Sequence, residues 1–89
     1  MRKMKAVETA NQAYTRLQND VGCLLDLAAQ ELKRHAEAQK ADPQNWGRPG
    51  DLGEVKARLK QVLSFLMGGT DEEANDRAIE NHLAEMRNQ

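Results

Sequence analysis

Both prolines and the only tryptophan of this 89-residue chain fall within one short stretch, residues 42–51, together with two of its six glycines. Proline lacks a backbone donor and fixes φ, glycine permits positive φ, and a residue before proline is disfavoured in the helical region. We therefore expect no helix to run through this stretch. It is interpreted as a connector between two helical segments.

Before the connector, apolar residues recur at alternating steps of three and four, the spacing of one face of a helix. This stripe consists of Val7, Ala10, Tyr14, Leu17, Val21, Leu24 and Ala28. The pattern predicts a long helix over residues 10–41, with Thr9 and Gln12 as a capping box and Asp42 at its end. Gly22 lies inside the helix, where it costs about 1 kcal/mol relative to alanine.

Two shorter helices are predicted after the connector. Asp51 and Glu54 form the capping signature of a helix predicted over residues 52–67. Gly68-Gly69 predicts the end of that helix. Thr70 and Glu73 then predict a capped third helix over residues 71–87. Its apolar stripe is short, so we expect it to be the least anchored element; the stripe comprises Ala78, Ile79, Leu83 and Met86.

The predicted fold class is all-α, with residues 1–89 forming a single domain. At 1.5 Å per residue the first helix would be about 48 Å long and the second about 24 Å. A hairpin of these two helices leaves half of the first one uncovered, and the polar third helix is a poor cover. We therefore expect a homodimer that builds a four-helix bundle. The candidate interface is Val7, Ala10, Tyr14, Leu17, Val21 and Leu24.

Composition narrows the compartment and the classes of partner. Thirteen basic and 14 acidic residues give a net charge of −1, which provides no general attraction to nucleic acid. The apolar runs are too short to span a membrane, and no signal-like stretch follows the basic start. A single cysteine excludes an internal disulfide, so we expect the reducing cytoplasm. That cysteine, Cys23 beside Leu24, is expected to be buried and inert.

The connector is the candidate partner loop, through Asn45, Trp46 and Arg48, since loops often carry function. The simpler interpretation is structural. Trp46 would fold back over the open end of the helix pair, while Asn45 and Asp51 fix turns and caps.

We predict no catalytic residues, no cofactor and no metal site. Glu31 with His35, and His82 with Glu85, read as ordinary surface pairs. The acidic run of the third helix suggests one alternative, a metal-dependent all-helical hydrolase, although no second acidic helix faces it. Acids at a helix start also offset the helix dipole, which explains several of them without a ligand. The run is Asp71, Glu72, Glu73, Asp76 and Glu80.

A weak nucleic-acid association is the other alternative. It rests on the basic N-terminus and on Lys56, Arg58 and Lys60 of the second helix. A helix-turn-helix is disfavoured, because the first turn of the third helix would present acids to the phosphates. The leading expectation is a small helical protein-interaction module, an adaptor, inhibitor or accessory subunit, whose partners are itself and another protein.

Overall fold

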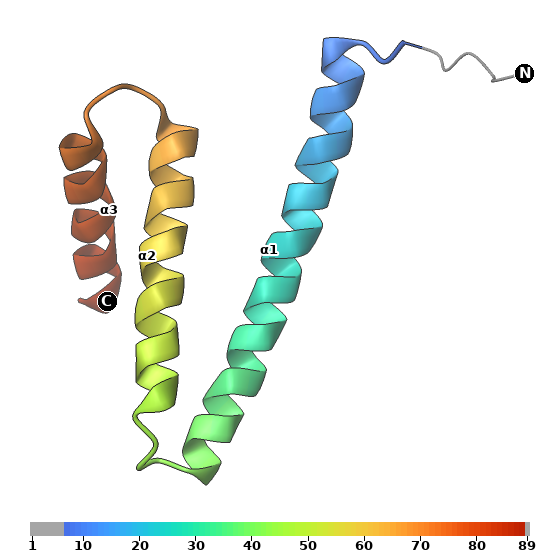
Figure 1. Ribbon diagram of the computed structural model, residues 1–89. Helices are drawn as coiled ribbons and strands as arrows, with labels where there is room; N and C mark the ends of the chain where they lie inside the picture. The colour runs from blue at the N-terminus through green and yellow to red at the C-terminus, as the bar shows by residue number, and fades with distance from the viewer. Residues whose placement is uncertain (1–6, 89) are drawn as a thin grey trace, which may run out of the picture. The chain divides into compact units, whose positions relative to one another are not determined.

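The computed structural model describes residues 7–88, and these residues form three helices without any strand. The helices are α1 (Ala10–Ala41), α2 (Gly47–Met67) and α3 (Glu72–Arg87) (Figure 1). The all-α prediction is confirmed, as is the order of a long, a shorter and a short C-terminal helix. The chain divides into two compact units, Met1–Pro43 and Gln44–Gln89, which are described separately.

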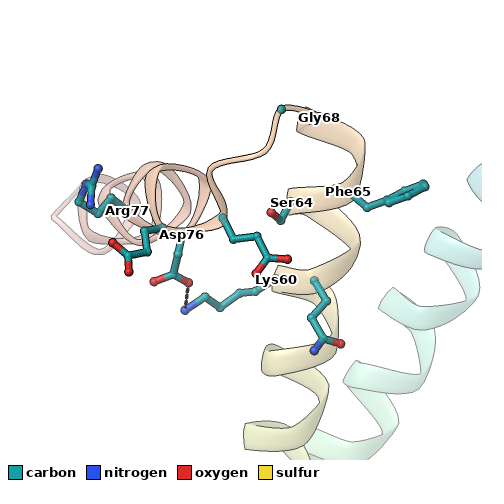
Figure 2. A pocket seen from close by; sticks show the side chains of 10 residues that line it. Lys60, Ser64, Phe65, Gly68, Asp76 and Arg77 are labelled. Atoms are coloured by element: carbon teal, nitrogen blue, oxygen red, sulfur yellow. Dashed lines mark ion pairs between the residues drawn. The ribbon is translucent and has the colours of Figure 1, made fainter.

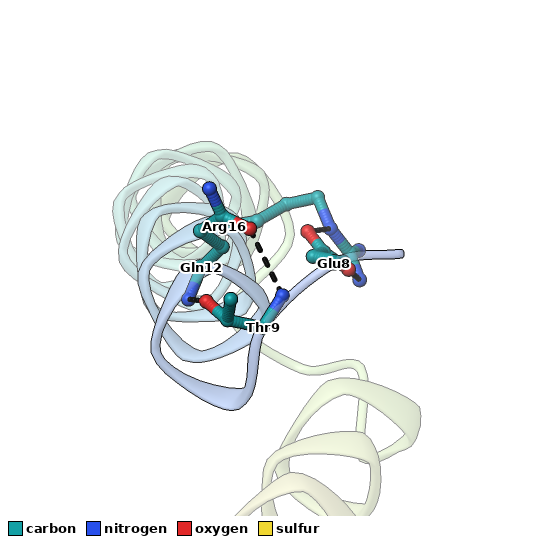
Figure 3. Close-up of polar contacts among 4 residues, drawn as sticks. All are labelled: Glu8, Thr9, Gln12 and Arg16. Atoms are coloured by element: carbon teal, nitrogen blue, oxygen red, sulfur yellow. Dashed lines mark hydrogen bonds and ion pairs between the residues drawn. The ribbon is translucent and has the colours of Figure 1, made fainter. Parts of the chain in front are cut away.

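The first unit contains one helix, α1, whose predicted bounds are confirmed. Thr9 is its N-cap: the Thr9 hydroxyl accepts from the Gln12 backbone N–H at 3.1 Å, and the Gln12 side chain accepts from the Thr9 N–H at 2.9 Å (Figure 3). This reciprocal capping box satisfies two donors that the first turn of a helix leaves open. At the other end, the Asp42 backbone N–H donates to the Gln39 carbonyl at 3.1 Å.

The second unit pairs α2 with α3, which lie side by side and are joined by a turn at Gly68 and Gly69 (Figure 1). Both glycines have positive φ, 78° and 79°, a conformation that side chains with a Cβ rarely adopt. The predicted stop of the second helix is therefore confirmed. Its physical cause is the left-handed backbone that reverses the chain.

The predicted start of the second helix was wrong, because α2 begins at Gly47 rather than Leu52. Pro49 is the third residue of α2, and the first turn of a helix needs no intrahelical N–H donors, so proline is tolerated there. Asp51 accordingly lies inside the helix and is not its N-cap. Glu54 does not complete a capping box either, since its carboxylate pairs with Arg58 at 2.8 Å.

The predicted cap of the third helix was displaced by one residue. Asp71, not Thr70, is the N-cap of α3, and its carboxylate accepts from the Ala74 backbone N–H at 3.0 Å. An aspartate at this position accepts a hydrogen bond from an open backbone donor, and its negative charge interacts favourably with the positive end of the helix dipole. Glu73 therefore lies in the first turn of α3 rather than in a capping box with Thr70.

The interior of the second unit is small. Among residues 7–88, Ile79 of α3 is the one buried apolar side chain, with 8% of its surface exposed. The third helix thus supplies the buried contact, contrary to the expectation that it would be the least anchored element. None of residues 47–67 in α2 reaches the same degree of burial.

Candidate interaction surfaces

The predicted dimer interface forms one exposed apolar stripe along α1. The exposed fractions are 65% for Tyr14, 51% for Leu17, 48% for Val21 and 63% for Leu24. A helix shields part of each side chain with its own turns, and the described residues of the unit Met1–Pro43 contain no second helix that could add to this cover. Ala10, the first residue of the helix, lies on the same face. Val7 is exposed but precedes the N-cap, so it does not lie on the helix.

The polar side of α1 is organised by ion pairs within the helix and its lead-in. Arg16 binds both carboxylate oxygens of Glu8, through Nε at 3.0 Å and Nη2 at 3.1 Å (Figure 3). The hydrogen bonds that Arg16 donates to Glu8 raise the pKa of Arg16, with a smaller contribution from the charge of Asp20. Further along, at the next position after the apolar stripe, Glu31 pairs with Arg34 of the following turn at 2.9 Å.

Cys23 of α1 is exposed, so the expectation of a buried thiol was wrong. The neighbouring leucines are exposed as well, and no residue of α1 is buried, so proximity to apolar residues did not imply burial. Gly22, beside it, has open space where a Cβ would lie.

The candidate partner loop has a more local structure than expected. The Asn45 side-chain oxygen accepts from the Gly47 backbone N–H at 2.8 Å, which confirms that Asn45 fixes the turn. Trp46 is the residue before α2 and is 84% exposed, so its predicted folding back over a helix end was wrong. Arg48 is half-buried in the first turn of α2. An exposed indole is a candidate contact surface rather than a plug.

Four charged residues join α2 to α3 and form what we call the α2–α3 ion cluster. Its members are Lys56, Lys60, Asp76 and Glu80. The Lys60 ammonium lies 2.6 Å from an Asp76 carboxylate oxygen (Figure 2). It also lies 2.7 Å from a carboxylate oxygen of Glu80, and the Lys56 ammonium lies 3.4 Å from Glu80. Hydrogen bonds to Asp76 and then Glu80 raise the pKa of Lys60, and the bond from Lys60 lowers the pKa of Glu80.

Asn75 makes a second polar link between the two helices. Its side-chain nitrogen donates to the Ser64 hydroxyl and the Gly68 carbonyl, both at 3.0 Å, and to the Ser64 carbonyl at 3.3 Å. The carbonyls at the end of a helix have no intrahelical partners, so Asn75 of α3 caps the C-terminus of α2. Neither this cap nor the ion cluster was predicted. The sequence holds two lysines four residues apart on one helix and two acids four residues apart on the next, but this spacing does not fix which faces of the helices meet.

Part of the acidic run of α3 borders a groove. A groove of about 830 Å³ lies over the turn and the start of α3, bordered by Lys60, Phe65, Glu72 and Asp76 (Figure 2). Two acids of the run, Asp76 and Glu80, form ion pairs with Lys60 of α2. Among residues 7–88, no group of three His, Cys, Asp or Glu side chains is placed to hold a metal ion.

Comparison of the chain with protein-family models, with curated proteins and with solved structures found no match. Over residues 7–88, none of the helices combines the length and the apolar character needed to cross a membrane.

Proposed function

We propose that this chain is a small helical protein-interaction module that acts by packing α1 against helices of another chain and has no chemistry of its own. The observation that supports it is the composition of the unit Met1–Pro43. This unit contains one helix with an exposed apolar stripe, and a single helix has no other element of its own unit to cover that stripe. Helices in proteins derive most of their stability from packing such a face.

The length of α1 supports a cover supplied by another chain. At 1.5 Å per residue, the 32 residues of α1 span about 48 Å and the 21 residues of α2 about 31 Å. The earlier start of α2 reduces the predicted difference in length, yet α1 remains longer by 11 residues, or about 16 Å. We infer that the chain assembles as a homodimer around α1 and recruits a further protein as an adaptor, inhibitor or accessory subunit.

The contacts of charged residues weigh against the two alternatives. Lys56 and Lys60, which carried the basic-surface hypothesis, are engaged by Asp76 and Glu80 of α3. The same contacts place an ammonium group where the hydrolase hypothesis needs a divalent metal. The basic residues Arg2, Lys3 and Lys5 lie outside the described residues. A cytoplasmic location remains part of the proposal and rests on the single cysteine of the chain.

The proposal is tested by capture of purified chain by an affinity-tagged copy of the same chain. Tyr14→Glu places a charge in the apolar stripe, and we expect it to reduce capture at least tenfold because an unpaired carboxylate would be buried. Asn19→Glu adds the same charge on the opposite side of the helix and should leave capture unchanged. Equal capture by both variants would show that the stripe of α1 is not the contact surface.

A further inference from the structure

The strict three-four stripe of α1 runs from Ala10 to Ala28, and exposed Leu25 and Leu32 continue the apolar surface beside it. From Ala10 to Ala28 the positions of the stripe hold only apolar residues, and all of them are exposed. Continuing the same steps of three and four brings Glu31 and then His35 to the next two positions. A partner helix that pairs with the apolar part alone therefore overlaps α1 from its first residue to Ala28.

We propose that the partner is a second copy of this chain, with the two α1 helices antiparallel and Leu17 of each packed against Val21 of the other. The proposal rests on the proposed function, because it specifies the occupant of the same face. In this register Tyr14 meets Leu24 and Ala10 meets Ala28 across the pair. The whole apolar stretch is thereby matched with itself.

The sizes of the facing residues favour this register. The larger side chains meet one another in the central layers, and alanine meets alanine at both ends, where the helices approach closely. In an isologous pair of this kind each contact occurs twice, once on either side of the twofold axis. Six stripe positions within α1 therefore give six facing contacts. All six residues of one copy then lie against apolar residues of the other.

Charge separates this arrangement from the competing ones. A parallel pair in register would align the two helix dipoles and would bring Glu31 against Glu31 of the second copy. An antiparallel pair shifted by one heptad toward the C-terminus would place Tyr14 against the carboxylate of Glu31. Shifted the other way, it would place Leu24 against Val7 of the second copy, which precedes the helix. The proposed register keeps Glu31 and His35 outside the overlap.

The proposed register carries one recognisable cost. Asp20 borders the apolar stripe, and in an antiparallel pair with this register the two Asp20 carboxylates lie on the same edge near the twofold axis. Arg16 attracts Asp20 from one turn away and offsets part of the repulsion. A shift of one heptad would remove apolar contacts of several stripe residues. We expect this loss to exceed the repulsion between two exposed Asp20 carboxylates, so the proposed register remains the favoured one.

Cysteine cross-linking tests orientation and register directly. In a Cys23→Ser background, Leu17→Cys and Val21→Cys chains are mixed and oxidised, and the products are separated by mass. Facing positions bring the Cα atoms within the distance that a disulfide needs, whereas each residue lies farther from its own equivalent. We expect the mixed Leu17–Val21 dimer to be the main product. Predominant Leu17–Leu17 product would overturn the antiparallel arrangement, while leaving the proposed use of the α1 face intact.

The repulsion at Asp20 provides a second, independent readout on the uncross-linked chain. Asp20→Asn should tighten self-association by about two- to fivefold, because it removes a like-charge pair across the interface. Asp26→Asn, the same change on the outer side of α1, is the matched control and should have no effect. Equal effects of the two substitutions would exclude this register. A wild-type chain that forms no dimer at all would overturn both this inference and the homodimer of the proposed function.

Discussion

Replacement of Ile79 by alanine tests how the second unit is held together. Ile79 is the buried apolar residue between α2 and α3, with 8% of its surface exposed. The substitution removes three carbon atoms, which at about 0.8 kcal/mol per buried carbon gives a loss of roughly 2 kcal/mol. Buried Ile→Ala changes in large cores cost about 2–5 kcal/mol, and a thin interior that can collapse belongs at the lower end. For a chain of this size, such a loss is a large part of the total stability.

The assay is urea unfolding followed by circular dichroism at 222 nm, combined with hydrogen exchange of the amides in α2 and α3. Ile79→Ala should lower the free energy of unfolding by about 2 kcal/mol and speed exchange in both helices. Met86→Ala is the control, because Met86 is 53% exposed on the same helix and should cost well under half as much. Equal losses for the two variants would refute the view that Ile79 anchors the pairing of α2 with α3.

Three further predictions concern substitutions of single residues. The raised pKa of Lys60 and the lowered pKa of Glu80 set a pH window for the α2–α3 ion cluster. The Lys60 contribution is complete below its ordinary pKa of 10.5 and is lost above the raised value, whereas the Glu80 contribution is complete above 4.5 and is lost below the lowered value. Lys60→Met should flatten this dependence in urea titrations from pH 3 to 11, and an unchanged profile would contradict it. Thr9→Ala removes the capping box and should destabilise α1 by about 1 kcal/mol, seen as faster amide exchange in its first turns; exchange equal to wild type would exclude the cap as a stabilising contact. Gly22→Ala should stabilise α1 by about 1 kcal/mol, because no atom lies within 4 Å of the added Cβ, and a lower helix content by circular dichroism would contradict this.

The sequence was most informative where hydrophobic period and local chemistry agreed. For α1, the steps of three and four, the Thr9–Gln12 capping box and the Asp42-Pro43 end all indicated the same helix, and its bounds are confirmed. The stop at Gly68 was predicted for a similar reason, since a left-handed turn needs glycine there.

Prediction failed where two local signals competed for one helix start. Asp51 looked like a better N-cap than Trp46, yet the helix begins before it, because a proline in the first turn does not interrupt the hydrogen bonds of a helix. Thr70 and Asp71 are both acceptable caps, and the sequence pattern alone could not choose between adjacent candidates. These errors moved boundaries by one to five residues and left the fold class unaffected.

The contacts between helices were beyond sequence reasoning for a different reason. The pairing of Lys60 with Asp76 and Glu80, and the capping of α2 by Asn75, depend on which faces of α2 and α3 meet. Periodicity identifies an apolar face but not the rotation of one helix against the next, so charged residues at its borders cannot be paired in advance. Cys23 was assigned to an interior from its neighbours in sequence and Trp46 from its place at the end of the helix pair, yet both are exposed.

The central claim is that the apolar face of α1 is covered by another chain. Sedimentation equilibrium of the purified wild-type chain, over protein concentrations from low to high micromolar, measures this most directly. The account predicts a concentration-dependent rise from the mass of one chain to that of two. A single-chain mass at every concentration would contradict it.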